Sequence, residues 1–583
     1  MKFLHVATAS LLASICNGSP LSFAERQAPG SYYAIRGPVG GVHPRLEIRE
    51  LQKTGDMWNL FLLALTEFEA MNQNEIDSYY QIAGIHGQPW QNWDGVNTIH
   101  SPPLPRGYCP HGELLFLQWH RPYISLFEQK LQSIAIGIAN QFTGTVKTRY
   151  QDAAQKLRLP YWDWATATPT NVPIFPIVLA QERVQVTFPN NSVAQIDNPL
   201  FDYNFHPKEA SINATGCWPS GGGLISYDSM CNIGVKTVRS YVPNDITTSN
   251  YTELERRYRN ILRSMRQSTF NSLSRTQEYN TFSNRGTCGP ESLDGSGGRS
   301  SIETPHNTIH EQMAPGHMVP IAVSAFDPVF WLHHANVDRF MALWQVINPN
   351  DFMKPCNQTG VQYTTAANQL LDENTPLAPF HRNAAGDFWT SANSRRIADL
   401  GYTYPELVNS PSAANIITIV KNLYSGPATG GPPAAAKRQE TTPTPKKDFM
   451  ANIQIPNLDI AYSLYLFVGD VSGGADDWAG LESFAGITSS LESHGGSKEV
   501  SDSIDITYAI DKSIAAGKTT PEGAVEYVKK TLKWRVGSGG KEVSRDKIPG
   551  VKISLVTYDV QEAKSESEFD TYTNAKSHGE IAA

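Results

Sequence analysis

Seven of the chain's 15 histidines form two groups that lie far apart in the sequence, and each group can supply three imidazoles to one metal ion. The first group is His86, His111 and His120, and the second is His306, His310, His333 and His334. Three neutral imidazoles per ion, without a carboxylate or thiolate ligand, suit copper or zinc. Because a catalytic zinc usually needs only one such set, two all-histidine sets indicate a pair of coupled copper ions.

Two members of the second group lie on one face of a predicted helix. His306 and His310 are four residues apart, so their side chains project from the same side, one turn apart. Thr304 is placed to cap this helix, and Pro305 suits its first position. A histidine pair at this spacing is often a coincidence when it stands alone, so a third ligand is needed to indicate a site.

The third imidazole can come from a second helix, whose start is well marked. Asp327 can cap this helix and Pro328 fits its first position. The helix carries His333 and His334 side by side. Asp338 follows His334 by one turn, which puts a carboxylate near the His334 ring or near backbone groups that position it.

The first group is distributed over loops and one helix. His111 and His120 are nine residues apart, so on a single helix they would face opposite sides, at about 100° per residue. We therefore expect His111 in the proline- and glycine-flanked loop 109–112, and His120 on the helix that follows. His86 is expected in another loop, residues 84–87. Taken alone, each of these histidines is more often structural than a ligand.

Hydrophobic periodicity predicts a mostly helical, loop-rich unit over residues 30–425. Long helices are expected at 57–71, with Asp56 as N-cap, and at 116–139, 251–273 and 330–347. Proline-dense loops such as 101–110 separate them. These helices must position the two histidine groups.

The composition changes abruptly after residue 425, where Gly, Pro, Ala, Thr and Lys predominate. Such a segment is too poor in large apolar residues to pack, so we assign a linker to 425–448. It contains the dibasic pair Lys437-Arg438, which is either a processing site or a solvated pair. Strand-like runs follow at 462–468, 504–508 and 551–556. Residues 449–583 are therefore expected to form a separate domain dominated by antiparallel sheet.

The N-terminus predicts a secreted, extracellular protein. Lys2 followed by an apolar stretch and small residues is typical of a signal peptide, which we assign to 1–19, leaving a core domain at 20–424. No later run is long and apolar enough to predict a membrane span. The net charge is −8 with no basic stripe, so neither nucleic acid nor membrane is expected as a partner.

In a secreted protein, two further sequence patterns predict glycosylation and disulfide bonds. Glycosylation acceptor triplets begin at Asn190, Asn213, Asn250 and Asn357. Cys16 should leave with the signal peptide. Two disulfides are expected among Cys217, Cys231, Cys288 and Cys356, with three possible pairings.

Several stretches resemble the fungal tyrosinase and polyphenol oxidase family of type 3 copper proteins. Residues 111–121 (HGELLFLQWHR) resemble its first copper signature, and residues 327–338 (DPVFWLHHANVD) resemble its second. Residues 160–164 (PYWDW) and 401–405 (GYTYP) resemble core segments of fungal members. The resemblance covers roughly residues 30–410. It implies a mainly α fold, with a type 3 copper four-helix-bundle core and long loops, to which the C-terminal antiparallel β domain is added.

The resemblance also implies which residues hold the cofactor, two copper ions that cycle between Cu2+ and Cu+. His86, His111 and His120 match the ligands of the first copper, and His306, His310 and His334 match those of the second. The second histidine of the doublet is the ligand in the family, so His334 is chosen over His333. Cys109 matches a cysteine that fungal members join to a ligand ring by a thioether, here the ring of His111; the alternative is a free or disulfide-bonded cysteine.

The activity implied is the oxidation of small o-diphenols to o-quinones, with O2 as co-substrate. Some members also hydroxylate monophenols, which requires a base because a phenol has a pKa near 10. Glu303 and Asn307 match a glutamate and an asparagine that hold the water proposed as this base. In the alternative, Asn307 caps a helix, Glu303 is a surface charge, and the protein is a catechol oxidase without monophenolase activity.

Fungal relatives imply one further partner, the chain's own C-terminal domain, which covers the site until proteolysis and so makes the protein a zymogen. The chain has no cysteine after Cys356, so it lacks the Cys-x-x-Cys that some members carry there. A hemocyanin-like O2-binding protein shares the dicopper chemistry and remains an alternative. A hydrolase with two zinc or iron ions is a third reading, although such sites usually include bridging carboxylates.

Overall fold

The computed structural model describes residues 31–101, 106–206, 236–242, 245–276, 278–286, 300–426, 446–456, 458, 460–491 and 499–581. The predicted signal peptide, most of the linker and the dibasic pair lie outside these residues, as do Asn213, Cys217, Cys231 and Cys288. Cys356 is disulfide-bonded. No helix within the described part of the chain has the length and apolar character to cross a bilayer.

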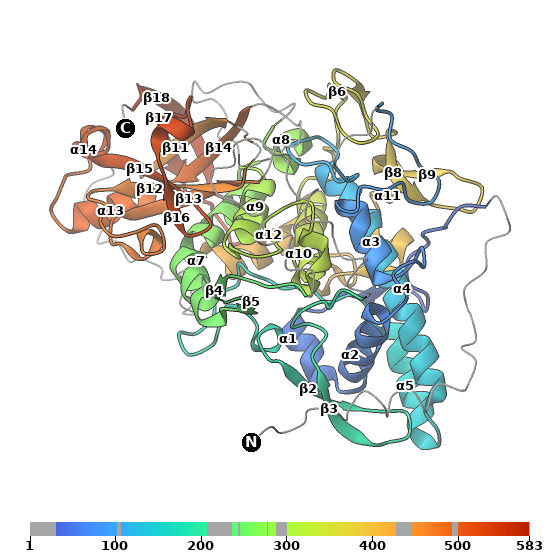
Figure 1. Ribbon diagram of the computed structural model, residues 1–583. Coiled ribbons are helices and arrows are strands. Elements are labelled where there is room, and N and C mark those ends of the chain that lie inside the picture. Colours follow the sequence, from blue (N-terminus) through green and yellow to red (C-terminus); the bar gives the residue numbers. More distant parts are fainter. Residues whose placement is uncertain are drawn as a thin grey trace.

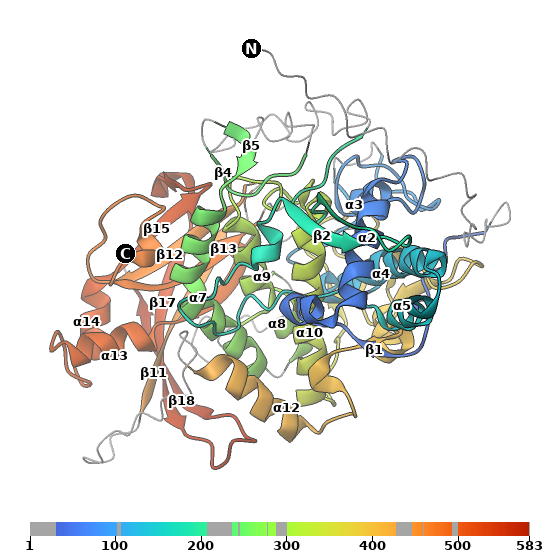
Figure 2. The same ribbon diagram turned by 90° about the horizontal axis from the view of Figure 1, so that it is seen from below.

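A helical unit forms most of the molecule, with a β-rich unit against one side (Figure 1, Figure 2). Its helices are α1 (Ile48–Leu51), α2 (Asp56–Glu69), α3 (Tyr79–His86), α4 (Phe116–Gln141), α5 (Thr145–Lys156), α7 (Tyr251–Ser274), α8 (Tyr279–Ser283), α9 (Glu303–Glu311), α10 (Pro328–Ile347), α11 (Ser391–Ser394) and α12 (Ala413–Val420). Its strands form short pairs: β1 (His43–Pro44) with β10 (Tyr402–Thr403), β2 (Arg183–Thr187) with β3 (Val193–Asp197), β4 (Tyr241–Val242) with β5 (Asp245–Ser249), β6 (Cys356–Asn357) with β7 (Leu370–Leu371), and β8 (Pro376–His381) with β9 (Phe388–Thr390).

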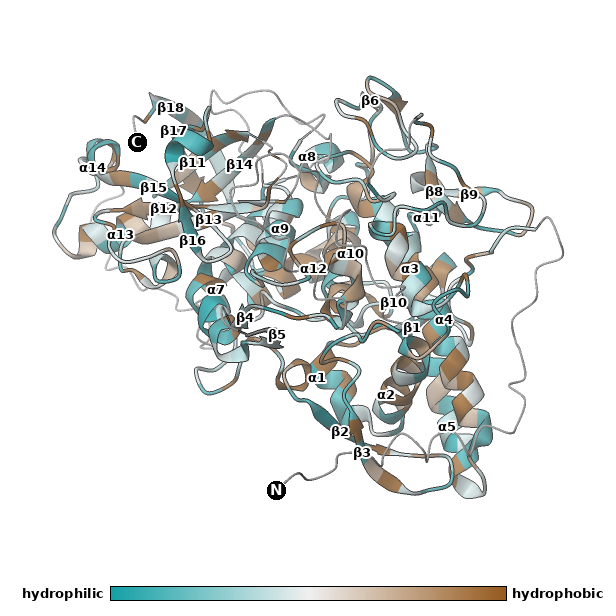
Figure 3. Cartoon of the chain, in the orientation of Figure 1, coloured by the Kyte–Doolittle hydropathy of each residue, from teal (hydrophilic) through white to brown (hydrophobic). Residues whose placement is uncertain are grey.

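The four long helices predicted from periodicity are present, and α10 begins as expected. The Asp327 side chain accepts a hydrogen bond from Val329 N, and Pro328 is the first helical residue. The start of α2 was wrong by one residue, because Gly55 is the N-cap and Asp56 lies inside the helix. Apolar residues are frequent along α2 and α10, whereas α7 carries many hydrophilic residues (Figure 3).

The C-terminal unit is a sandwich of two antiparallel four-stranded sheets. One sheet has the order β14-β11-β17-β18, and the other has the order β13-β12-β15-β16. The strands are β11 (Lys447–Pro456), β12 (Tyr462–Val468), β13 (Phe484–Ser490), β14 (Glu499–Asp505), β15 (Leu532–Ser538), β16 (Lys541–Val543), β17 (Lys552–Gln561) and β18 (Thr571–Glu580). Two helices, α13 (Thr507–Ala515) and α14 (Ala524–Thr531), follow β14 and precede β15 in the sequence. The fold class, a helical core with a C-terminal antiparallel β domain, is therefore confirmed.

Strand β12 is buried on both faces, which explains its nearly continuous apolar run. Alternate residues of a strand face opposite sides of the sheet. Leu464 and Leu466 pack in the sandwich core, whereas Tyr465 and Phe467 pack against the core of the helical unit. The sheet that contains β12 is thus the wall by which the C-terminal unit contacts the helices.

Two strand predictions need correction. The predicted strand 504–508 ends at Asp505, because Thr507 and Tyr508 already belong to α13. The run at 551–556 is only the first half of a longer strand, β17. The first C-terminal strand, β11, was not predicted from the sequence.

Candidate metal centre

The structure brings the two histidine groups together in the interior of the molecule. Within each group, the possible ligand atoms lie within 4.8 Å of one another, and all the side chains are buried. One group contains Cys109 with the first three histidines; the other is His306, His310, His333 and His334. The groups touch each other as well. The His120 ring stacks on the His334 ring with centroids 4.2 Å apart, and the His111 and His306 rings are 5.9 Å apart.

His86 is held by the main chain on two sides. It is the last residue of α3 and not part of a loop, which corrects the expectation. Its Nδ1–H donates to the carbonyl oxygen of Ile321, at 2.9 Å. Gly107 packs on the His86 main chain so closely that a Cβ there would lie 2.1 Å from the His86 carbonyl oxygen. Only glycine fits, so this contact fixes the end of α3 against the loop that leads to His111.

His111 lies in a loop and His120 on the helix that follows, as the nine-residue spacing predicts. His120 lies in the second turn of α4, and its Nδ1–H donates to Phe116 O, at 2.7 Å. Cys109 Sγ lies 3.3 Å from Nδ1 and 3.8 Å from Nε2 of His111. Because Cε1 is bonded to both nitrogens, the sulfur is on the Cε1 side of the ring. Cys109 is a free, buried cysteine here.

Helix α9 presents His306 and His310 from one face. The helix begins at Glu303 after an Ile302 N-cap, so the predicted capping by Thr304 was wrong. The His310 Nδ1–H donates to the carbonyl oxygen of Met318. The His306 Nδ1–H donates to Asn307 Oδ1, at 2.8 Å. In both rings the hydrogen bond at Nδ1 leaves Nε2 as the nitrogen that can bind a metal.

Helix α10 presents both members of the histidine doublet to the second group. His334 Nε2 lies 3.3 Å from His306 Nε2. When two nitrogens bind the same tetrahedral ion, each at about 2 Å, they lie about 3.3 Å from each other. His333 instead stacks on the His306 ring, with centroids 4.9 Å apart and planes at 23°. Among the described residues, neither ring nitrogen of His333 has a hydrogen-bond partner.

The Asp338 carboxylate does not approach His334, contrary to one of the two positions expected for it. Its Oδ1 accepts from Arg121 Nε at 2.7 Å, and its Oδ2 from Arg45 at 3.2 Å. The hydroxyls of Tyr402 and Tyr404 donate to the same Oδ2, at 2.7 and 2.6 Å. Since Arg121 directly follows His120, this buried ion pair connects α4, which carries His120, to α10, which carries His333 and His334.

The buried environment keeps the imidazoles neutral, as metal binding requires. Burial lowers the pKa of His120 to about 3 and that of His310 to about 4. Burial, together with the neighbouring histidines, lowers the pKa values of His306 and His334 well below the usual range. Neutral nitrogen donors, without a carboxylate among them, fit copper or zinc, so the residues present fit the two ions that the sequence predicts.

Glu303 and Asn307 lie beside the metal-facing histidines. Both line a small cavity that His111 also lines. Glu303 is buried, which excludes a surface charge; its Oε1 accepts from Gly112 N at 2.7 Å and its Oε2 from Arg285 N at 2.9 Å. Burial raises the pKa of Glu303 above its usual value. Asn307 bonds to the ring of His306 and does not cap a helix.

The C-terminal unit closes this cavity from the other side. Ser490, Leu491 and Val500 line it together with His111 and Asn307. Leu491 directly follows β13, and it packs in a buried apolar cluster with Val319 and Ile321. Sequence reasoning did not find Leu491, because its position depends on how the edge of one sheet meets α9.

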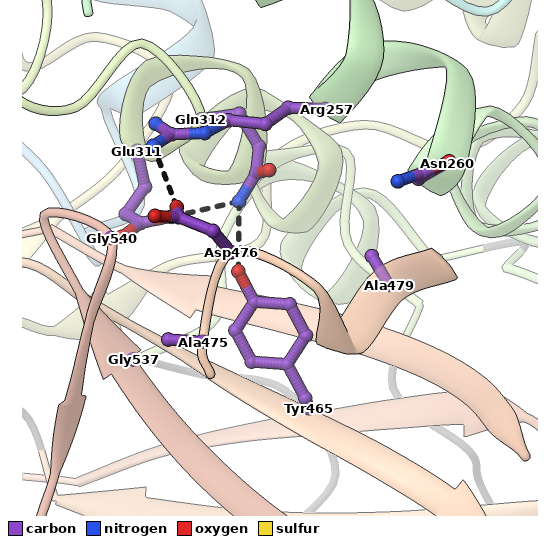
Figure 4. Close-up of a pocket in the computed structure, with 10 residues that line it drawn as sticks. All are labelled: Arg257, Asn260, Glu311, Gln312, Tyr465, Ala475, Asp476, Ala479, Gly537 and Gly540. Atoms are coloured by element: carbon purple, nitrogen blue, oxygen red, sulfur yellow. Dashed lines mark hydrogen bonds and ion pairs between the residues drawn. The ribbon is translucent and has the colours of Figure 1, made fainter. Parts of the chain in front are cut away.

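A polar contact region holds the two units together farther from the cavity. Figure 4 shows a pocket between α7, α9 and the C-terminal strands, where Arg257 pairs with Asp476 at 2.8 Å. Gln312 donates to the hydroxyl of Tyr465, at 3.3 Å. Glu311 accepts from Ser463 Oγ, at 2.6 Å. Because α9 carries these contacts beside its ligand histidines, docking of the strands is tied directly to the site.

Comparison with known proteins gives matches over both units. The family model described as the common central domain of tyrosinase matches residues 76–347. The model described as the tyrosinase C-terminal domain matches residues 448–555. A tyrosinase of Neurospora crassa is 37% identical over 379 residues, which are 63% of this chain and 53% of the relative. Polyphenol oxidase 2 of Agaricus bisporus is 33% identical over 386 residues, 64% of this chain and 63% of the relative. The match thus spans between half and two thirds of these curated relatives.

Solved structures match along almost the whole chain. A recombinant mushroom tyrosinase is 25% identical, with a TM-score of 0.76, over 94% of this chain and 98% of that one. The holo-protyrosinase of Aspergillus oryzae is 20% identical, with a TM-score of 0.72 over the same shares. The second likeness is one of fold alone. Both the helical unit and the β-rich unit described above therefore have counterparts in solved structures.

Proposed function

Because the chain belongs to the tyrosinase family, we propose that it is a copper-dependent enzyme that oxidises o-diphenols to o-quinones with O2. The observation that carries this proposal is the contact between two groups of buried, neutral imidazoles, with the His120 and His334 rings 4.2 Å apart. Two bound copper ions would supply the redox chemistry, taking two electrons from each diphenol and passing them to O2. Each diphenol also loses two protons, so one O2 consumes two diphenols and yields two water molecules.

The chain's own residues hold and orient this chemistry. His86, His111 and His120 would hold the first ion, and His306, His310 and His334 the second. Main-chain carbonyls at Nδ1 of three of these rings fix the tautomer that leaves Nε2 available. Asn307 does the same for His306. Burial of all six excludes water except at two small cavities among the described residues, one beside Asn307 and one lined by His86, Cys109 and His111.

Cys109 supports a further part of the proposal, the thioether bond to His111. The sulfur lies on the Cε1 side of the His111 ring, 3.3 Å from Nδ1. Formation of the bond removes the thiol proton, the ring C–H proton and two electrons, which O2 can accept. The bond would hold the His111 ring in place, and peptide mapping that found unmodified Cys109 and His111 in the copper-loaded protein would contradict it.

We also propose that the protein hydroxylates monophenols. A phenol must lose its proton before hydroxylation, and Glu303 and Asn307 line the same cavity as His111 on one face of α9. Together they would hold the water that accepts this proton. The alternative is a catechol oxidase without this activity, and kinetics on a monophenol without added catechol discriminate between the two.

The C-terminal unit, residues 449–583, would cover the site until it is released. Leu491 lines the cavity beside Asn307, and it packs in a buried apolar cluster with Val319 and Ile321. Cleavage in the linker 425–448, at or near the dibasic pair Lys437-Arg438, would permit release. Secretion to the extracellular space would follow from the signal peptide 1–19, and Asn190 and Asn357 lie in exposed positions open to glycosylation.

The test uses the full chain, folded and loaded with copper, before and after cleavage within the linker. Turnover of 4-methylcatechol and of 4-methylphenol is measured in both states. The proposal predicts two copper ions per chain, little diphenol turnover before cleavage and at least tenfold more after it. A cleaved, copper-loaded protein that binds O2 but oxidises no diphenol would contradict the proposal and favour an O2-binding protein.

A further inference from the structure

We propose that Arg285 is a specificity-determining residue that binds the carboxylate of a phenolic acid, and that the docked C-terminal strands occupy its binding position in the full chain. The inference rests on the proposed function, since it concerns the substrate of the same site. The ligand class is a catechol or phenol that carries a carboxylate on a short side chain.

Arg285 is part of the wall of the cavity. It follows α8, and it lines the same cavity as His111, Asn307 and Leu491. Its main-chain N–H donates to Glu303, at 2.9 Å, so the Arg285 backbone is fixed beside the metal-facing groups. A substrate whose ring lies over the metals at this cavity would therefore have its substituents within reach of the guanidinium.

Three groups of the C-terminal unit contact this guanidinium. Ser489 O and Thr488 Oγ1, both on β13, accept hydrogen bonds from it, the latter at 3.0 Å. Asp502 on β14 lies 3.6 Å from it, and both side chains are only 1% exposed. A buried guanidinium is costly unless a carboxylate or other acceptors satisfy it. The strands therefore supply Asp502 as a counter-charge to Arg285, in addition to Glu303 of the helical unit, and their release would remove Asp502.

The same strands present two groups that resemble the two ends of a phenolic acid. Leu491 is an apolar residue that lines the cavity, where the substrate ring would lie. Asp502 puts a carboxylate against Arg285. Once the strands leave, a substrate carboxylate can replace that of Asp502, because the planar guanidinium offers paired donors suited to a carboxylate.

Arg257 provides a matched comparison. It is a largely buried arginine, with its side chain 11% exposed, that pairs with a more exposed C-terminal carboxylate, Asp476, at 2.8 Å. Arg257 lines the pocket in Figure 4, whereas the cavity beside His111 is lined by Arg285. Loss of Arg257 should loosen the contact between the units without changing which substrate is preferred.

The experiment compares two diphenols on the copper-loaded full chain, folded first and then cut within the linker. The ratio of kcat/KM for 3-(3,4-dihydroxyphenyl)propionate to that for 4-methylcatechol is measured. In Arg285→Gln we expect this ratio to fall roughly 10- to 100-fold, as for loss of a charge-assisted hydrogen bond. Arg285→Lys should recover part of it, and Arg257→Gln should keep it within about twofold.

If the Arg285→Gln variant does not fold, the unmutated enzyme provides a second test. The unmutated enzyme should prefer the acid to its methyl ester by roughly tenfold, since only the acid carries the charge. Equal use of acid and ester, an unchanged ratio in Arg285→Gln, or an equal fall in Arg257→Gln would overturn the inference and leave the proposed function standing. Failure of the unmutated enzyme to oxidise either diphenol would overturn both.

Discussion

At the scale of single residues, the site depends on which nitrogen of each ring is free. Main-chain carbonyls occupy Nδ1 of His86, His120 and His310, and the Asn307 amide occupies Nδ1 of His306. Burial keeps the rings neutral, so each offers a lone pair at Nε2. This selection is made by the contacts of each ring, which histidine spacing alone does not specify.

The doublet on α10 gives the sharpest residue-scale prediction. His334→Gln should leave about one copper per chain, because His334 Nε2 faces His306 Nε2 at 3.3 Å. His333→Gln is the matched control and should keep two, because the His333 ring packs flat against His306. Metal analysis of both purified variants measures this. Loss of one copper in His333→Gln, with two retained in His334→Gln, would reverse the ligand assignment.

Glu303 gives a second residue-scale prediction. Glu303→Gln keeps the shape of the side chain but removes the charge that would help a water accept the phenol proton. We expect turnover of 4-methylphenol to fall at least tenfold more than turnover of 4-methylcatechol, since only the monophenol needs that base. Equal losses on the two substrates would show that Glu303 serves only to hold Gly112 and Arg285.

At the scale of elements, the helices that carry the histidines are tied together by buried charge. Asp338 on α10 pairs with Arg121 on α4 and with Arg45, and all three side chains are at most 2% exposed. Removal of one partner from such a network leaves the others buried and uncompensated. The network therefore fixes the distance between α4 and α10, and with it the distance between the two histidine groups.

Asp338→Ala should lower the free energy of unfolding by about 3–5 kcal/mol, because it leaves the buried Arg121 without its carboxylate partner and Arg45 with Glu128 alone. The control is Glu50→Gln, which breaks the exposed pair with Lys53 and should cost less than about 1 kcal/mol. Thermal unfolding of both variants is the measurement. Equal small effects would mean that the buried network is not what holds α4 to α10.

The Asp338 carboxylate also makes the stability of the fold depend on pH. Burial would raise the pKa of Asp338, but Arg121 and Arg45 outweigh it and hold the pKa below its usual value. A depressed pKa adds stability that is present above the unfolded pKa of about 3.9 and is lost as pH falls through the lower folded value. The difference in Tm between the parent and Asp338→Ala should therefore shrink below about pH 4, and a constant difference down to pH 2 would contradict this.

The bounds of helices and strands were predicted well where local sequence signals were strong. They were predicted less well where tertiary contacts determine where an element ends. Asp327 and Pro328 mark the start of α10 unambiguously, and β12 was predicted at its observed bounds. The run 504–508 alternates like a strand, yet Thr507 and Tyr508 belong to α13, because the chain turns away from the sheet after Asp505. The partners of Asp338 were missed, although an arginine directly after His120 was a signal for them.

At the scale of the whole molecule, one β-sheet of the C-terminal unit packs over the side of the helical unit that holds the histidine groups. Strand β12 faces the sandwich with Leu464 and the helices with Tyr465. At the end of the neighbouring β13, Leu491 reaches the cavity beside His111. These contacts depend on how two units dock, so composition and periodicity predicted a separate β domain but not the residue that closes the site.

Leu491→Ala in the full, uncleaved chain should raise the low turnover of 4-methylcatechol several-fold, because it opens the cavity beside Asn307. Leu464→Ala is the matched control, with the same truncation inside the sandwich core and away from the cavity. Initial rates of both variants are compared with the parent. A similar rise in both variants would indicate general loosening of the C-terminal unit and not removal of a plug.

The central claim is that the two histidine groups form one dicopper centre. An anomalous difference map at the copper absorption edge, from crystals of the copper-loaded full chain, tests it most directly. We predict two peaks per chain, each about 2 Å from three Nε2 atoms of one group and about 3.5–4 Å from each other. A single peak, or two peaks too far apart for one O2 to bridge, would contradict the account.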